Sequence, residues 1–150
     1  MNDIKSKKAF SLIELVFAIV IIGILAAVAI PRLAATRDDA EITKARVLVA
    51  SVRNALSMER QKRILRGEFK VLTAVGDSTN VFGNFYDADG DTNSSVLDYP
   101  IVSKPVKARW EFDSGEYIFH MMDDVAFVVD ARGKFVCVDA NTTGCKSLTN

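Results

Sequence analysis

The sequence predicts an α+β fold, a ladle in which a long N-terminal helix protrudes and packs by its outer half on a small antiparallel sheet. Three observations predict it. Residues 10–30 form an apolar run, apolar residues at helical spacing continue from there towards Gly67, and an alternating apolar pattern begins at Val106. About 120 residues follow the apolar run, which is enough for one small domain with a modest core and not for two.

The apolar run of residues 10–30 is long enough to cross a membrane. At about 1.5 Å per residue, a helix of this length covers roughly 30 Å of hydrocarbon. A secretory signal peptide has a shorter apolar core, which ends in a cleavage site of small residues. Here apolarity continues up to Pro31 and the helical pattern resumes beyond it. We therefore expect a spanning helix rather than a removable signal peptide.

Glu14 is the one carboxylate within this run. An ionised side chain in a membrane costs about 2.5–3.5 kcal/mol on insertion scales, so such a residue is by default functional and needs a partner. The run itself offers no oppositely charged side chain. Glu14 is therefore a candidate functional residue, and snorkelling towards the headgroups near the helix end is the alternative.

The helical pattern resumes after Pro31 and predicts a second, amphipathic half of the same helix. Pro31 lacks a backbone donor and Gly23 has low helix propensity, so the segment between them is the weakest part of the helix. For an isolated subunit we expect an intact helix with a kink at Pro31. Gly67 is the expected end of the helix. The predicted core face contains Ile42, Ala45, Val49, Val52 and Leu56.

Four short strands are predicted after the helix, at residues 106–112, 117–122, 126–129 and 135–138. The breaks between them are short and contain Gly or Asp, which favours hairpins and an antiparallel meander. In the first strand we expect one apolar face, made by Val106, Ala108, Trp110 and Phe112. The outer half of the helix is the only long element available to cover such a sheet.

Charge gives little support for nucleic-acid binding. The chain has 19 basic and 19 acidic residues. Acidic residues interleave with the cations on the outer helix, so we interpret this face as solvated surface or subunit contact and expect no direct nucleic-acid binding. The cations concerned are Arg53, Arg60, Lys62, Arg63 and Arg66, with Glu59 and Glu68 between or after them.

A second chemical signal is an acidic segment that contains Asp87, Asp89, Asp91, Asn93 and Asp98. Their spacing resembles positions one, three, five, seven and twelve of a calcium-binding loop of the EF-hand kind. Thr92 replaces the glycine of the sharp turn, Asp98 is shorter than the usual glutamate, and no pair of flanking helices is evident. Two interpretations stay open, a Ca²⁺ site and a solvated polar turn.

Catalysis has no support in the sequence. The chain has one histidine, His120, and lacks a Gly-rich phosphate loop and a G-x-S-x-G motif. No set of nucleophile, base and orienting residue can be assembled from it. We therefore expect a protein that is not an enzyme and that requires no cofactor.

The residues Lys7-Lys8-Ala9-Phe10-Ser11-Leu12-Ile13-Glu14-Leu15-Val16, with the apolar run up to Pro31, carry a family resemblance. This segment resembles the N-terminal signature of type IV pilins and of the pseudopilins of type II secretion and competence systems. The resemblance implies cleavage by a prepilin peptidase between Ala9 and Phe10, and methylation of the new amino group of Phe10. The family usually has Gly before the cut, where this chain has Ala9.

The resemblance also implies a role for Glu14 in assembly, together with Phe10 and Pro31. The family's glutamate meets the N-terminal amine of a neighbouring subunit, which would neutralise both charges within the membrane. Breaking a buried pair costs about 3–5 kcal/mol, so a subunit docked out of register would be disfavoured. In filaments of the family, the region between the corresponding Gly and Pro can lose helicity.

The family's topology implies a cytoplasmic leader at residues 1–9, a transmembrane and assembly helix at 10–31, and a periplasmic globular domain at 32–150 of a single-pass protein of the bacterial inner membrane. Loss of the leader would leave 16 basic and 18 acidic residues. Cys137 and Cys145 are the only cysteines, and an oxidising compartment would pair them, as in the C-terminal disulfide of the family. A third cysteine for a zinc site is lacking.

The expected function is therefore that of a structural subunit of a type II secretion or competence pseudopilus. The alternatives are a type IV pilus subunit for adhesion or motility, and a calcium-binding envelope protein that does not polymerise. The implied partners are further copies, other pilin-like subunits, the prepilin peptidase, the inner-membrane assembly platform and membrane lipid.

Overall fold

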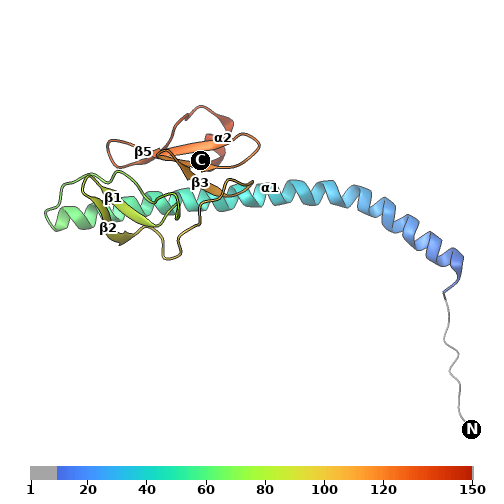
Figure 1. The fold of residues 1–150 in the computed structure, drawn as a ribbon. Helices are drawn as coiled ribbons and strands as arrows, with labels where there is room; N and C mark the ends of the chain where they lie inside the picture. Colours follow the sequence, from blue (N-terminus) through green and yellow to red (C-terminus); the bar gives the residue numbers. More distant parts are fainter. Residues whose placement is uncertain (1–9, 150) are drawn as a thin grey trace, which may run out of the picture. The chain divides into compact units, whose positions relative to one another are not determined.

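The computed structural model describes residues 10–149, with the backbone alone at positions 34, 35 and 91 (Figure 1). The predicted leader, including Ala9, lies outside the described residues. The contacts within the chain separate two units, one up to Asp39 and one from Ala40 onward, which we describe one after the other. The elements are a long N-terminal helix, six strands and a short C-terminal helix.

Helix α1 runs from Leu12 to Leu65 without interruption at Gly23 or Pro31. This confirms the expected intact helix through the weak segment. The helix ends where the sequence predicts, because Gly67 adopts the left-handed backbone conformation with φ 79°. The Gly67 N–H donates to the carbonyl of Ile64 (3.0 Å) and the Glu68 N–H to that of Arg63 (2.9 Å), the bonding pattern of a Schellman motif.

The predicted meander is confirmed as a four-stranded antiparallel sheet in the order β3-β4-β5-β6. Its strands are β3 (Trp110–Asp113), β4 (Glu116–Phe119), β5 (Val125–Val129) and β6 (Phe135–Cys137). The first strand is shorter than predicted. It begins at Trp110 because Ala108 has φ 60°, which breaks the extended conformation, and Val106 is exposed rather than part of a buried face.

Three elements were not predicted. Strands β1 (Asn84–Asp87) and β2 (Gly90–Ser95) form a separate antiparallel hairpin within the segment that the sequence analysis assigned to a loop. Helix α2 (Thr143–Thr149) follows β6, and the Thr142 hydroxyl accepts the N–H of Cys145 (3.2 Å) at its start. Strand β2 has the sequence Gly-Asp-Thr-Asn-Ser-Ser, in which no apolar residues alternate with polar ones and Gly, Asp and Asn disfavour a strand, so the sequence gives no signal for it.

The core of the second unit lies between the outer half of α1 and the four-stranded sheet. All five predicted helix residues contribute to it, with Ala45, Val49, Val52 and Leu56 buried and Ile42 partly buried. Seven aromatic rings extend the core across the sheet, with neighbouring ring centroids 5.0–5.8 Å apart. These rings are Phe82, Trp110, Phe112, Tyr117, Phe119, Phe127 and Phe135.

The aromatic core also fixes the connection that follows α1. The buried Tyr117 hydroxyl accepts the backbone N–H of Val75 at 2.8 Å. Burial raises the pKa of Tyr117 to about 12, so this phenol stays neutral at physiological pH. Together, the long N-terminal helix and the antiparallel sheets confirm the predicted α+β fold.

Candidate functional site

The first half of α1 leaves its apolar side chains without cover. Among the described residues, its large apolar side chains have exposed fractions from 40% at Ile21 to 80% at Leu12, and Phe10, which precedes the helix, is 84% exposed. α1 is also the one helix in the described part of the chain that is long and apolar enough to cross a membrane. A surface of this kind is stable in contact with lipid or with another apolar helix.

Glu14 occupies the third position of α1, and one of its carboxylate oxygens accepts the backbone N–H of Ser11 at 3.0 Å. A glutamate at this position satisfies a backbone donor that the helix leaves unpaired, and its charge is favourable near the positive end of the helix dipole. No oppositely charged side chain lies within the apolar run, but the spacing Ser-x-x-Glu signals this contact in the sequence. Glu14 is thus held at the helix start by the backbone.

Gly23 and Pro31 both lie within α1. A methyl group built at Gly23 would meet no atom within 4 Å, so no contact of the described chain requires glycine there. The position is therefore free for close approach of another helix, since small residues let helix backbones come together.

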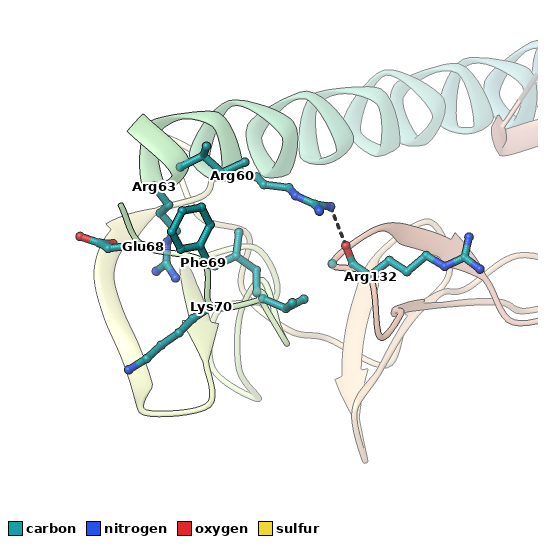
Figure 2. Close-up of a pocket in the computed structure, with 10 residues that line it drawn as sticks. Arg60, Arg63, Glu68, Phe69, Lys70 and Arg132 are labelled. Atoms are coloured by element: carbon teal, nitrogen blue, oxygen red, sulfur yellow. Dashed lines mark hydrogen bonds between the residues drawn. The ribbon is translucent and has the colours of Figure 1, made fainter. Parts of the chain in front are cut away.

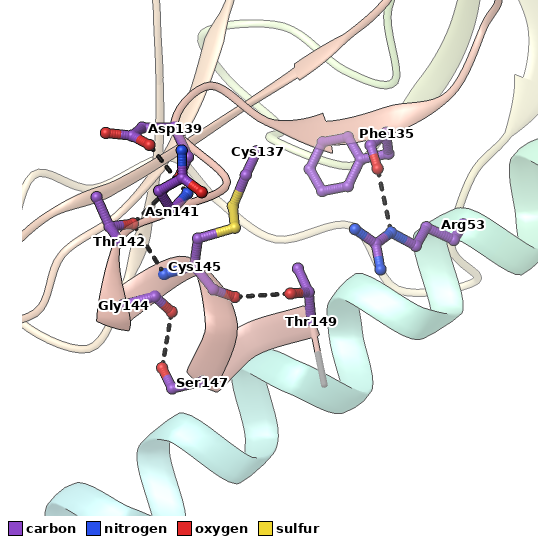
Figure 3. Close-up of a disulfide and its surroundings, with 10 residues drawn as sticks. All are labelled: Arg53, Phe135, Cys137, Asp139, Asn141, Thr142, Gly144, Cys145, Ser147 and Thr149. Carbon is purple, nitrogen blue, oxygen red and sulfur yellow. Dashed lines mark hydrogen bonds between the residues drawn. A yellow bond between two sulfur atoms is a disulfide. The ribbon is translucent and has the colours of Figure 1, made fainter.

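The cations of the outer helix are more closely tied to the fold than predicted. Arg46, Arg53 and Arg60 lie seven residues apart and thus on one face of α1. Each donates a guanidinium N–H to a backbone carbonyl of the C-terminal part of the chain, at 2.8–3.1 Å. The acceptors are the carbonyls of Ser147, Phe135 and Arg132, and the last two contacts are visible in Figures 3 and 2.

A buried ionic network lies near the end of α1. The side chains of Glu59 and Arg63 are only 6% and 5% exposed, and they are joined at 3.2 Å. Arg63 also reaches Asp87 at the end of β1, with 2.8 Å between nitrogen and oxygen. Ser94 of β2 donates its hydroxyl to Glu59 at 3.2 Å. The hydrogen bond from Arg63 holds the pKa of Asp87 below its usual value, so the carboxylate stays charged. This network fixes the β1–β2 hairpin to α1.

The five residues of the predicted calcium loop lie on or just after this hairpin. Asp87 is paired with Arg63, and Asp89 forms an ion pair with Lys70 and donates its backbone N–H to Asp87 at 2.9 Å. Asp91 pairs with Tyr86 in the strand register, Asn93 has φ 53°, and Asp98 is exposed beyond β2.

This arrangement favours the polar turn over the calcium loop. Among the described residues, no three His, Cys, Asp or Glu side chains are placed to hold a metal ion together. Two of the five candidate ligands already have cationic side chains as partners. Calcium binding stays a prediction.

A shallow hollow separates the end of α1 from the loop that precedes β6 (Figure 2). Its wall combines cationic and apolar side chains, among them Arg60, Lys70, Arg132 and the exposed Phe69. Gly133 closes one side. Its φ is 72°, and a methyl group at its Cα would lie 3.2 Å from the Val71 side chain. The hollow contains no cluster of groups with which a reaction could be assembled.

Cys137 and Cys145 form a disulfide with 6.2 Å between their Cα atoms (Figure 3). The bond joins the end of β6 to α2, where Cys145 and Leu148 are buried. The predicted pairing is therefore present in the structure. It encloses the exposed turn at residues 139–143.

The single histidine contacts two carboxylates. His120 lies 2.9 Å from Glu111 of β3 through Nε2 and 3.1 Å from Asp124 of the β4–β5 turn through Nδ1. These contacts could not be predicted from the sequence, because the three residues converge only through strand pairing. No nucleophile is present in this contact set.

Comparison with known proteins adds two findings. Residues 4–30 match the family model described as the prokaryotic N-terminal methylation motif. Two fimbrial proteins of Pseudomonas aeruginosa are each 38% identical to this chain over 94 residues, which is 63% of this chain and 54% of the relative. The chain thus matches about half the length of these curated relatives. No solved structure is significantly similar to it.

Proposed function

We propose that this chain is a type IV pilin-like protein and a structural subunit of a pilin-like filament, because residues 4–30 match the N-terminal methylation motif and two fimbrial proteins are similar to it. A prepilin peptidase cuts between Ala9 and Phe10, the new amino group of Phe10 is methylated, and residues 10–31 hold the subunit in the inner membrane before assembly. The globular part, residues 32–150, then lies on the periplasmic side. Its partners are further copies, other pilin-like subunits and the inner-membrane assembly platform.

The exposed apolar half of α1 is the observation that carries this proposal. Its side chains find no cover among the described residues, although the outer half of the same helix is well packed. Lipid satisfies such a surface before assembly, and the helices of neighbouring subunits satisfy it afterwards. A membrane anchor alone would also need apolarity, but a neutral residue could cap its helix start, whereas the charge of Glu14 costs free energy within lipid.

Three assemblies fit these features, two kinds of pseudopilus and a surface pilus. The small size of the chain and its short disulfide loop favour a pseudopilus of type II secretion or competence, which is our first proposal. The fimbrial relatives favour a surface type IV pilus. A deletion strain scored separately for secreted protein, for DNA uptake and for surface fibres distinguishes the three assemblies, because each loses a different activity.

Processing is tested on the protein isolated from its native envelope. We expect a chain that begins at methylated Phe10, which peptide mass spectrometry of the N-terminal fragment measures. A mature protein that still begins at Met1 would overturn the proposal.

The role of Glu14 is tested with two substitutions that separate its charge from its hydrogen bond. Glu14→Ala removes both, whereas Glu14→Gln keeps an oxygen that accepts the Ser11 N–H. If the charge pairs with a neighbouring N-terminus, both variants enter the membrane normally but fail to enter filaments alongside wild-type subunits. Normal filament entry of Glu14→Gln, with loss in Glu14→Ala, would instead restrict Glu14 to capping the helix.

A further inference from the structure

Two segments that the filament function does not use share one sequence pattern. They read Asp91-Thr92-Asn93-Ser94-Ser95 and Asp139-Ala140-Asn141-Thr142-Thr143. Each contains Asn-x-Ser/Thr with no proline at x, the acceptor pattern for N-linked glycosylation of exported proteins. Each also has an aspartate two residues before the asparagine, so one transferase with a cationic subsite at that position would read both.

The second segment presents its asparagine in an accessible turn (Figure 3). Residues 139–143 are all exposed, lie within the loop closed by the disulfide, and lead from β6 to Thr143 at the start of α2. The backbone N–H of Asn141 donates to the carboxylate of Asp139 at 3.0 Å, and the Thr142 hydroxyl donates to the Asp139 carbonyl at 3.0 Å. These bonds fix the turn through its backbone and leave the acceptor side chain outside the network.

The two side-chain groups that the glycosylation pattern requires are free of hydrogen bonds in the described part of the chain. Within residues 10–149, neither the side-chain amide of Asn141 nor the Thr143 hydroxyl forms a hydrogen bond. A glycosyltransferase needs both groups, since the amide nitrogen takes the sugar and the hydroxyl two residues later is the part of the pattern that the enzyme recognises. An enzyme that binds this turn therefore breaks no hydrogen bond of these two groups.

The first segment has the same residues in a less suitable setting. Asn93 lies in β2, and both of its neighbours are tied to the body of the domain. Thr92 donates its hydroxyl to the Phe85 carbonyl at 2.9 Å, and Ser94 donates to the buried Glu59 at 3.2 Å. Lifting this strand into an enzyme would break its bonds to the body of the domain, whereas the bonds of the Asn141 turn join residues 139–145 to one another.

We propose that Asn141 is the acceptor of an N-linked glycan, and this rests on the proposed function because a periplasmic domain is needed. The sugar donor is a polyprenyl-diphosphate-linked oligosaccharide. The amide nitrogen of Asn141 forms a bond to the anomeric carbon, the bond from that carbon to the diphosphate oxygen breaks, and the polyprenyl diphosphate leaves. The amide gives up one proton to a base of the transferase.

The test uses full-length protein expressed in, and isolated from, its native host. Trypsin releases residues 135–146 as one peptide that contains Asn141 and both cysteines, so one mass reports the site. We expect this peptide to carry added hexose or hexosamine mass that fragmentation places on Asn141. Asn141→Gln and Thr143→Ala should remove the added mass, and Thr143→Ser should retain it, because serine supplies the same hydroxyl.

An unmodified Asn141 in this material would overturn the proposal, whatever the state of Asn93. A glycan that persists in Thr143→Ala would also overturn it, because the attachment would then not depend on the acceptor pattern. The N-terminal peptide of the same sample reports cleavage before Phe10 independently. A cut N-terminus with a bare Asn141 refutes the glycan alone, whereas an uncut chain refutes the filament proposal.

Discussion

Substitution of Arg63 by methionine should strongly destabilise the globular part of the protein. The Arg63 side chain is only 5% exposed and is paired with both Glu59 and Asp87. Methionine keeps much of the volume but leaves two carboxylates close together at a site with little water. Removing one partner of a buried ion pair costs about 3–5 kcal/mol, and Ser94, Lys62 and Arg66 near Glu59 place the expected loss at the lower end.

Urea unfolding of the full chain in detergent measures this loss. Trp110 is the only tryptophan and is buried, so its emission reports unfolding of the core. Lys62→Met is the matched control, because it removes a cation one position away whose side chain is 60% exposed, and an exposed pair contributes about 0–1 kcal/mol. An Arg63→Met variant that loses no more stability than Lys62→Met would refute the reasoning.

Four further results are expected. The pKa of Asp87 is lowered in the folded state, so its charge stabilises the fold fully above the unfolded pKa of about 3.9, and this stabilisation is lost as pH falls through the folded pKa. The free energy of unfolding, measured from pH 6 to 2, should therefore fall less steeply with pH in Asp87→Asn than in the wild type. Gly76→Ala should cost about 1–3 kcal/mol, because its methyl would lie 2.0 Å from the Val81 carbonyl oxygen, whereas Gly23→Ala, with no atom within 4 Å and a higher helix propensity, should not lower thermal stability. Replacing both Cys137 and Cys145 by serine should lower the free energy of unfolding by about 2–3 kcal/mol, and an unchanged urea midpoint would contradict this. Millimolar Ca²⁺ should leave the melting temperature unchanged, because cations of the chain already hold two carboxylates of the β1–β2 hairpin, and a rise of several degrees would instead support the calcium site.

The helix and the four-stranded sheet could be predicted because their signals are local. Apolar residues at spacings of three and four from Ile42 to Leu56 identify the buried face of α1, and Gly67 supplies the left-handed position that ends it. Alternation between short polar breaks likewise identifies β3 to β6. In each case, residues that are close in the sequence are sufficient to identify the element and its buried face.

The β1–β2 hairpin and its ionic network could not be predicted in this way. Strand β2 consists of Gly and polar residues, and the hairpin is held by contacts with α1 that join positions 24 residues apart for β1 and 35 residues apart for β2. The acidic spacing suggested a metal site, whereas Arg63 supplies the positive charge in the structure. The capping contact of Glu14 is different, because its Ser-x-x-Glu signal is local and was available in the sequence.

The three arginines at seven-residue spacing recognise main-chain oxygen atoms, which every amino acid possesses. Replacement of Arg132 or Ser147 by another residue of compatible backbone conformation would therefore preserve the attachment. The C-terminal region can thus change its outward-facing side chains while the helix still fixes the path of its backbone.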